Sequence, residues 1–248
     1  MFSIPEQLLT SEQPFFLSEE SGYLTHSPTT QFYRINFNTD AYSDQLFEQF
    51  SIELPIQLST AINKRKAEYF AGRYCAKKLL DNKQFPNFEL RIGTGRAPCW
   101  PESIVGSISH VCDSAAAVVD SYYNLQVLGV DVEKVIETNV IKSTCNTILC
   151  SAEKLYLTRC ELVFSHAFTA TFSMKESLYK ALYPEVKKFF DFHSAEVVSL
   201  STERQQISLK LTKTLSEQYQ EGDMFTGSYA IEGKHVTTIL LTHKKTSD

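Results

Sequence analysis

The elements that the sequence predicts follow the same order twice, a helix and then strands. Apolar residues at helical spacing predict a first helix over about residues 60–80, and small and branched residues at 115–119 predict a strand buried on both faces. A second helical pattern is followed by alternating runs typical of an antiparallel sheet, at 195–200, 207–211, 224–231 and 236–242. Because no motif recurs at a fixed period, the repetition is one of architecture and not of sequence.

Capping residues give approximate ends for the two helices. Ser59 or Thr60 is a suitable N-cap for the first helix. Ser165 can cap a second helix over about residues 166–183, and Pro184 is expected to end it because proline cannot continue the hydrogen-bond ladder of a helix.

Length and composition favour a protein with a real core. The 248 residues, 43% of them hydrophobic, allow one large domain or two of about 120 residues. Residues 1–30 show no clear period and are expected to run over the surface before a strand at 31–37. Residues 136–160 are expected to be mixed helix and loop without a motif.

Charge and cysteine usage exclude several classes of protein. A net charge of −5 argues against a general nucleic-acid binder. The start of the chain lacks a basic region followed by an apolar core, and no apolar run approaches the roughly 18 residues that would span a bilayer. We therefore expect a cytoplasmic protein without a membrane span. We interpret the six cysteines as reduced thiols, because disulfides are expected in secreted chains and no secretory signal is seen here.

Residues 129–133 (GVDVE) form an apolar strand pattern that carries two acids. Successive side chains of a strand point to opposite faces, so Asp131 and Glu133 share a face while Val130 and Val132 face the core. Two carboxylates on one face repel each other unless a cation lies between them, and Mg²⁺ prefers oxygen ligands and recruits substrate phosphates. The alternative is a solvated edge strand with two exposed acids.

A third acid interrupts the apolar stripe of the second helix. Glu176 and Lys180 lie four residues apart on one face, with Lys175 beside them. An exposed pair at this spacing is commonplace and contributes only a few tenths of a kcal/mol. Within an apolar stripe, however, a charge is costly to bury unless it is paired or bound to a metal. The stripe consists of Phe168, Phe172, Tyr179 and Tyr183.

Basic residues that could meet an anion occur in three places before the acids. Arg65 and Arg73 lie eight residues apart on the first helix, about 80° apart around its axis, so both could reach one extended anion. Arg96 lies in a stretch rich in turn formers, and Ser109 and His110 precede the buried strand at 115–119. The alternatives are a solvated helix face for the arginines and a capped loop position for the histidine.

Taken in order, three motifs closely resemble the signature of the 4′-phosphopantetheinyl transferases, surfactin type: residues 106–110 (GSISH), 129–133 (GVDVE) and 172–181 (FSMKESLYKA). Residues 64–73 (KRKAEYFAGR) and 98–101 (PCWP) resemble the branch typified by the component D proteins of enterobactin synthetases. The resemblance covers roughly residues 60–185. Phe172 stands where many members have tryptophan.

The resemblance implies a pseudo-twofold α+β fold with two similar halves, residues 1–126 and 127–248, each with a helix packed on a small, mainly antiparallel sheet. It implies a monomeric, Mg²⁺-dependent enzyme that transfers 4′-phosphopantetheine from coenzyme A to a serine of an apo carrier protein and releases adenosine 3′,5′-bisphosphate. The expected acceptors are aryl or peptidyl carrier domains of a siderophore synthetase.

The resemblance also implies roles for individual residues. The metal ligands fall on Asp131, Glu133 and Glu176. Glu176 is expected to activate the carrier serine, directly or through a metal-bound water, and Lys180 to stabilise or protonate the leaving phosphate. The expected coenzyme A contacts are Arg65, Arg73, Arg96, Ser109, His110, Lys175 and Lys180.

Two alternative functions remain open from the residues alone. A Mg²⁺-dependent phosphohydrolase or nucleotidyltransferase would also use a D-x-E strand and a lysine, but it would not need a site for the 3′-phosphate of coenzyme A. A non-catalytic coenzyme A-binding relative would bind without transferring. Formation of the modified carrier distinguishes the transferase from both.

Overall fold

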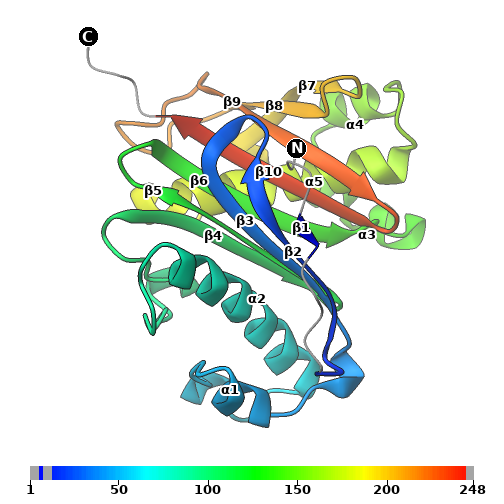
Figure 1. Ribbon diagram of the computed structural model, residues 1–248. Coiled ribbons are helices and arrows are strands. Elements are labelled where there is room, and N and C mark those ends of the chain that lie inside the picture. Colours follow the sequence, from blue (N-terminus) through cyan, green and yellow to red (C-terminus); the bar gives the residue numbers. More distant parts are fainter. Residues whose placement is uncertain (1–5, 8–12, 244–248) are drawn as a thin grey trace. The chain divides into compact units, whose positions relative to one another are not determined.

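The computed structural model describes residues 6–7 and 13–243 (Figure 1). The described residues up to Leu125 form one compact unit, the N-terminal unit, and those from Gln126 form another, the C-terminal unit. Each unit contains a five-stranded sheet and one long helix. The α+β architecture of helices on mainly antiparallel sheets is therefore confirmed.

In the N-terminal unit the long helix α2 (Asn63–Asn82) packs on β3, β4 and β5. The strand order is β1-β2-β3-β5-β4, and the neighbouring strands pair antiparallel. Short helices connect the third strand to α2: η1 (Thr39–Ala41), α1 (Gln45–Gln49) and η2 (Ile56–Leu58). The strands are β1 (Glu6–Gln7), β2 (Phe16–Leu24), β3 (Ser27–Phe37), β4 (Ile104–Val111) and β5 (Ser114–Ser121).

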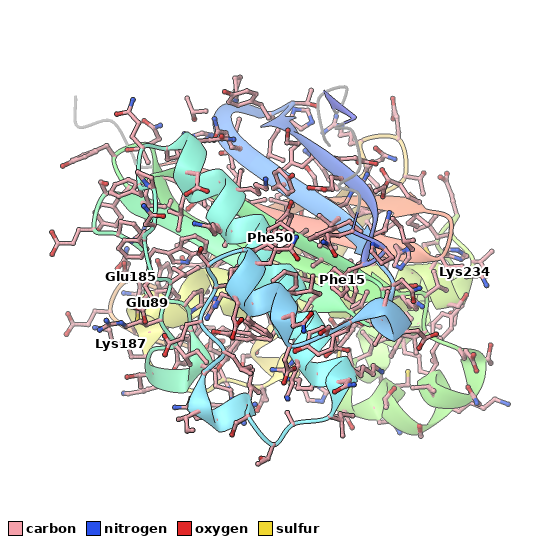
Figure 2. All side chains as sticks on the ribbon, turned by 60° about the horizontal axis from the view of Figure 1, so that its bottom comes forward. Phe15, Phe50, Glu89, Glu185, Lys187 and Lys234 are labelled. Atoms are coloured by element: carbon pink, nitrogen blue, oxygen red, sulfur yellow. The ribbon has the colours of Figure 1, made fainter. Side chains whose placement is uncertain are left out.

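The core of this unit is rich in aromatic side chains. Phe15 and Phe70 are fully buried, and their rings meet edge to face with centroids 5.4 Å apart. Phe50 lies against the same cluster and contacts Tyr74 of α2 (Figure 2). Tyr33 of β3 also meets Tyr74 edge to face, with ring centroids 6.1 Å apart. Edge-to-face aromatic pairs add about 0.5–1.5 kcal/mol beyond their buried area, so this contact helps to hold α2 on its sheet.

In the C-terminal unit the long helix α5 (Phe164–Val186) packs on β8, β9 and β10. Two shorter helices, α3 (Thr138–Ile148) and α4 (Ser151–Leu157), precede α5 and contact it. The strand order is β6-β10-β9-β8-β7. The strands are β6 (Leu125–Lys134), β7 (Ala195–Ser201), β8 (Gln206–Leu211), β9 (Met224–Glu232) and β10 (His235–His243).

The prediction that residues 1–30 lack regular structure is wrong where the structure describes them. Strands β2 and β3 form a long antiparallel hairpin within 16–37. Its period is hidden because a carboxylate, Glu19, is buried in β2, where it accepts hydrogen bonds from Tyr33 Oη at 2.5 Å and Tyr74 Oη at 2.9 Å. The prediction for 1–5 and 8–12 lies outside the described residues.

The predicted helix ends also need correction. Helix α2 begins at Asn63, after Ile62 as N-cap, and not at Ser59 or Thr60. Helix α5 begins after Val163 and continues through Pro184 to Val186. A proline near the end of a helix costs one backbone hydrogen bond, and Lys187, in the left-handed conformation, closes the helix by donating its N–H to Tyr183.

Within 6–7 and 13–243, none of the helices is both long and apolar enough to cross a membrane.

Candidate functional site

Three acids and one lysine gather in the C-terminal unit, and we call them the acid cluster: Asp131, Glu133, Glu176 and Lys180. Asp131 and Glu133 come from β6, and Glu176 and Lys180 lie one turn apart on α5. Lys180 Nζ lies 2.7 Å from Asp131 Oδ1, and the Asp131 residue is only 3% exposed. The alternative of two solvent-exposed acids on an edge strand is therefore wrong for Asp131.

Gly129 lets the helix of the acid cluster lie directly against its strand. A Cβ at this position would stand 2.0 Å from the backbone oxygen of Ser177 and 3.0 Å from the Cβ of Ala181. Any side chain larger than hydrogen would push α5 away from β6. This close approach explains why the motif begins with glycine, since it brings Lys180 within hydrogen-bond distance of Asp131.

Burial and neighbouring charges shift the pKa values of two acids in the cluster. Burial, followed by the charge of Asp131 and a smaller effect of Glu176, raises the pKa of Glu133 from 4.5 to about 8, although Lys180 opposes the shift. Burial and Asp131 likewise raise the pKa of Glu176 above its ordinary value, again against Lys180. Without a cation, both shifts favour the protonated forms of Glu133 and Glu176.

The donor set of the acid cluster suits a hard divalent cation. All three acids offer carboxylate oxygens, which Mg²⁺ prefers, and a cation would favour the ionised form of Glu133, whose pKa is raised by burial and by the charge of Asp131. In the part of the chain that the structure describes, these side chains do not form a closed cluster of three or more metal ligands. The chemistry fits a metal, and closing its ligand shell would require side-chain movement.

A second polar group lies on α2 and β4 of the N-terminal unit. Arg65 Nη1 is 3.4 Å from His110 Nε2, and the Glu68 carboxylate lies 3.6 Å from Arg65 Nη1 and 3.9 Å from His110 Nδ1. Gly72 makes this possible, because a Cβ there would stand 2.8 Å from Ile108 of β4. The carboxylate thus holds two basic side chains together, and Arg65 keeps 43% of its side chain exposed.

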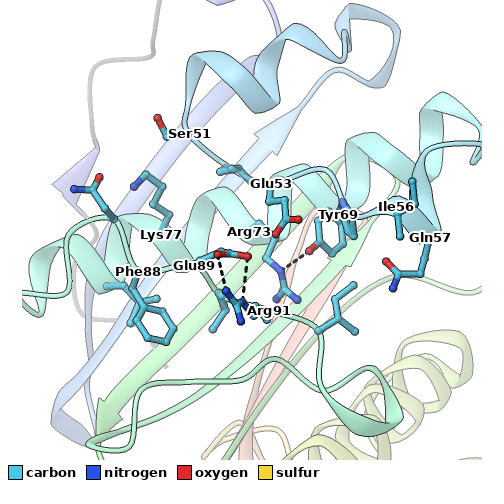
Figure 3. A pocket seen from close by; sticks show the side chains of 16 residues that line it. Ser51, Glu53, Ile56, Gln57, Tyr69, Arg73, Lys77, Phe88, Glu89 and Arg91 are labelled. Atoms are coloured by element: carbon cyan, nitrogen blue, oxygen red, sulfur yellow. Dashed lines mark hydrogen bonds and ion pairs between the residues drawn. The ribbon is translucent and has the colours of Figure 1, made fainter.

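Not all of the basic residues named from the sequence join this group. Arg73 lies over the ring of Tyr69, with its guanidinium carbon 4.9 Å from the ring centroid, and its Nε donates to Tyr69 Oη at 3.1 Å. It lines a cavity of about 620 Å³ together with Glu89 and Arg91 (Figure 3). Arg96 is exposed in the short helix η3 (Thr94–Arg96).

Ser109 and Lys175 are both buried, in different surroundings. Ser109 lies in β4 opposite Ala116 of β5. Lys175 lies beside Glu176 along α5, but its ammonium forms an ion pair of 2.8 Å with Glu153 of α4. The structure therefore brings Lys180, and not Lys175, to the carboxylates of β6.

Sequence reasoning missed two acids that organise these groups. Glu68 follows Arg65 at a spacing of three, which places both on one face of a helix, and this was a usable signal. Glu153 follows Cys150 at the spacing of a capping box, and both hydrogen bonds of that box are present. The signal was weak because cysteine replaces the usual serine or threonine.

Comparison with known proteins identifies the family. The model of the 4′-phosphopantetheinyl transferase N-terminal domain matches residues 54–120, and that of the 4′-phosphopantetheinyl transferase superfamily matches residues 127–239. Enterobactin synthase component D of Escherichia coli (strain K12) is 33% identical over 194 residues, which cover 77% of this chain and 85% of that protein. The chain belongs to the 4′-phosphopantetheinyl transferase superfamily.

Other transferases of this superfamily are also similar. Enterobactin synthase component D of Salmonella typhi is 34% identical over 187 residues, covering 74% of this chain and 75% of that protein. The 4′-phosphopantetheinyl transferase PptT of Mycobacterium tuberculosis is 29% identical over 147 residues, covering 58% and 63%. The resemblance inferred from the motifs is confirmed, and this chain is a transferase enzyme.

Proposed function

We propose that this transferase moves 4′-phosphopantetheine from coenzyme A to a serine of an apo carrier domain of a siderophore synthetase. The acceptor class is suggested by the relatives named enterobactin synthase component D. In the reaction the serine Oγ bonds to the phosphorus that carries the pantetheine arm. The bond from that phosphorus to adenosine 3′,5′-bisphosphate breaks, and the serine proton must be accepted by a base.

The contact between Lys180 and Asp131 carries this proposal. Phosphoryl transfer depends mainly on positioning and on neutralising charge, so an ammonium held at 2.7 Å by a buried carboxylate is a fixed cation where a phosphate could bind. We propose that Lys180 stabilises the negative charge of the leaving bisphosphate, or donates a proton to it. Because Asp131 holds the ammonium in place, little reorganisation is needed when the charge develops.

Glu176 is our candidate for the base. Its half-buried carboxylate lies one turn from Lys180, and burial and Asp131 raise its pKa. A base is most effective when its pKa lies near the working pH, so the upward shift makes Glu176 a better proton acceptor than an exposed carboxylate. We propose that it takes the proton of the carrier serine.

We propose that Asp131, Glu133 and Glu176 hold Mg²⁺. When bound, the ion would neutralise charge on the phosphates of coenzyme A. The protein's own contribution is to hold these carboxylates of β6 and α5 in one partly buried group, where burial and the charge of Asp131 raise the pKa of Glu133.

On the N-terminal unit we propose that Arg65 and His110 contact the phosphates of coenzyme A, with Glu68 holding them in position. A guanidinium supplies forked donors suited to phosphate. Ser109, Arg73 and Arg96 remain further candidates for contacts along coenzyme A, and the two arginines would then act apart from the pair formed by Arg65 and His110.

We further propose that the enzyme is a monomer of the cytoplasm. All six cysteines, each within the described residues, are free thiols, which suits a reducing compartment.

Product stoichiometry tests the proposed reaction. With coenzyme A, Mg²⁺ and an apo carrier, we expect one adenosine 3′,5′-bisphosphate for each modified carrier, measured by chromatography and by mass spectrometry of the same sample. Nucleotide release in the absence of a carrier would favour a phosphohydrolase. Coenzyme A binding with neither product would indicate a non-catalytic relative.

A further inference from the structure

Lys175 is held by a buried polar network that the motif gives no reason to expect. Its ammonium donates to Glu153 Oε1 at 2.8 Å, to the carbonyl oxygen of Ile148 at 2.8 Å and to that of Phe192 at 3.0 Å. An ammonium group has three donors, and all three are used here. Its side chain is 2% exposed.

Glu153 is satisfied just as fully. Its Oε1 also accepts the backbone N–H of Val197 at 2.9 Å, and its Oε2 accepts that of Cys150 at 2.8 Å. The carboxylate, also 2% exposed, therefore caps the start of α4 while it pairs with Lys175. Burying two charges is tolerable only when their remaining donors and acceptors are satisfied, as they are here.

The pair ties four segments of the C-terminal unit to the middle of α5. Ile148 ends α3, Cys150 precedes α4, Phe192 begins the short helix η4 (Phe192–Ser194), and Val197 lies in β7. A buried ion pair contributes little net stability compared with an apolar replacement, but it can specify one arrangement. The arrangement specified here is the rotation of α5 about its axis at Lys175.

That rotation fixes the next residue, Glu176. Successive side chains of a helix are about 100° apart, so holding Lys175 inward against Glu153 sets the direction of Glu176. Lys180, one turn further along α5, has its own anchor in the ion pair with Asp131. A misplacement of about 1 Å in a catalytic group can cost about a hundredfold in rate.

We propose that Lys175 and Glu153 form a positioning pair that holds the Glu176 turn of α5, and that Lys175 does not contact coenzyme A. The inference rests on the proposed role of Glu176 as the base. Reaching a phosphate would require Lys175 to leave Glu153 as an unpaired buried carboxylate, which is strongly unfavourable.

The test is a mutant cycle of Lys175→Met and Glu176→Gln, in which kcat and the KM for coenzyme A are measured. We expect Glu176→Gln to lower kcat by about 10²–10⁴-fold and Lys175→Met by about a hundredfold. The double variant should be no slower than Glu176→Gln alone, because the pair acts through Glu176. In Lys175→Met the KM for coenzyme A should stay within about twofold of the wild-type value, since no contact with coenzyme A is removed.

Other outcomes overturn specific parts of the inference. A rise in KM in Lys175→Met, with losses that multiply in the double variant, would make Lys175 a coenzyme A contact. Losses in kcat that multiply without a change in KM would mean that the pair acts independently of Glu176. Full turnover of Glu176→Gln would instead overturn the proposed role of Glu176.

Three further variants separate positioning from general damage to the fold. Lys175→Arg combined with Glu153→Asp keeps the ion pair, with a longer basic side chain and a shorter acidic one, and should recover most of kcat. Lys142→Met, at an exposed lysine of α3, is the matched control and should behave as the wild type. If circular dichroism shows that Lys175→Met is unfolded, Glu153→Gln replaces it in the cycle, with the same expected results and the same contradicting ones.

Discussion

The Lys180 ammonium lies 2.7 Å from Asp131 Oδ1, and this contact joins α5 to β6 at the centre of the acid cluster. Burial and then the charge of Asp131 raise the pKa values of the other two acids, and Asp131 is itself the most buried of the three. It is therefore the residue through which the lysine, the two other acids and a bound cation would all be coupled.

Replacing Asp131 with alanine should abolish transfer while the protein stays folded. The substitution removes the proposed metal ligand and the partner of Lys180 together, so we expect a loss of at least about a hundredfold in rate at any Mg²⁺ concentration. The measurement is carrier modification across a Mg²⁺ titration, with circular dichroism as the folding control. Activity of wild type or variant in excess chelator would rule out the metal assignment.

Lys180→Met should lower kcat more than it raises the KM for coenzyme A. Removing one preorganised donor from a developing negative charge costs about 10²–10³-fold in comparable sites. Lys180→Arg keeps the charge and should retain part of the activity. Steady-state kinetics of both variants checks this, and Lys187→Met, at an exposed lysine near the end of the same helix, is the matched control. A change confined to KM would reduce Lys180 to a binding contact.

Glu133 should make the metal-free protein less stable as the pH rises. Its pKa is about 8 in the folded protein and 4.5 as an ordinary carboxyl, so the folded state binds more protons between these values. The contribution of Glu133 to the free energy of unfolding is fully present below pH 4.5 and is lost as the pH rises through 8.

Glu133→Gln should remove this dependence. In chelator, urea unfolding should show that the variant gains stability relative to wild type as the pH rises from 5 to 8. Glu185→Gln, at an exposed position of α5, is the matched control and should show no such gain. Adding Mg²⁺ should stabilise wild type more than Glu133→Gln. If the difference in unfolding free energy between the variant and wild type were the same at pH 5 and pH 8, the pKa of Glu133 would not be raised in the folded protein.

Arg65 and His110 should account for much of the preference for the 3′-phosphate of coenzyme A. A charged hydrogen bond contributes roughly 1.5–3 kcal/mol, so losing one should weaken binding by about ten- to a hundredfold. Dephospho-coenzyme A should be a poor donor for wild type, and its penalty should shrink in Arg65→Ala and His110→Ala. Kinetics with both donors at fixed ionic strength measures the penalty, with Arg91→Ala as the control. Equal penalties in every protein would remove both residues from this site.

Gly129→Ala should destabilise the C-terminal unit and reduce transfer together. The new Cβ would stand 2.0 Å from a backbone oxygen of α5, which must move by more than a side-chain adjustment. Overpacking of this kind costs about 1–3 kcal/mol, and the shift would separate Lys180 from Asp131. Urea unfolding and carrier modification of the same preparation test this. Unchanged values for both would show that the close approach is dispensable.

The sequence predicted the parts of the fold whose periods are regular. The helices around residues 60–80 and 166–183 and the four alternating runs after residue 195 are all present, because burial of one face leaves a clear pattern. The strand predicted at 31–37 is part of β3, but its partner β2 was missed because Glu19 is buried there against two tyrosines, and a buried carboxylate breaks the alternation.

The sequence predicted the residues of the candidate site from their types and from the order of the motifs, but not the contacts between them. The motifs pointed to Asp131 and Lys180, but only the structure shows the close approach of α5 to β6 at Gly129 that brings the two side chains into contact. Lys175 and Lys180 look similar in the sequence, yet Lys175 forms a buried ion pair with Glu153 and Lys180 forms an ion pair with Asp131. The capping-box spacing of Glu153 is a local signal, but its pairing with Lys175 leaves no pattern in the sequence from which it could be inferred.

The intact mass of an apo carrier domain after incubation with coenzyme A, Mg²⁺ and this enzyme tests the proposed reaction most directly. We expect the carrier to gain the mass of one 4′-phosphopantetheine, the gain to disappear when the carrier serine is replaced by alanine, and Asp131→Ala to produce none. An unmodified carrier in the presence of folded wild-type enzyme, across carriers of the aryl and peptidyl classes, would contradict the proposed function.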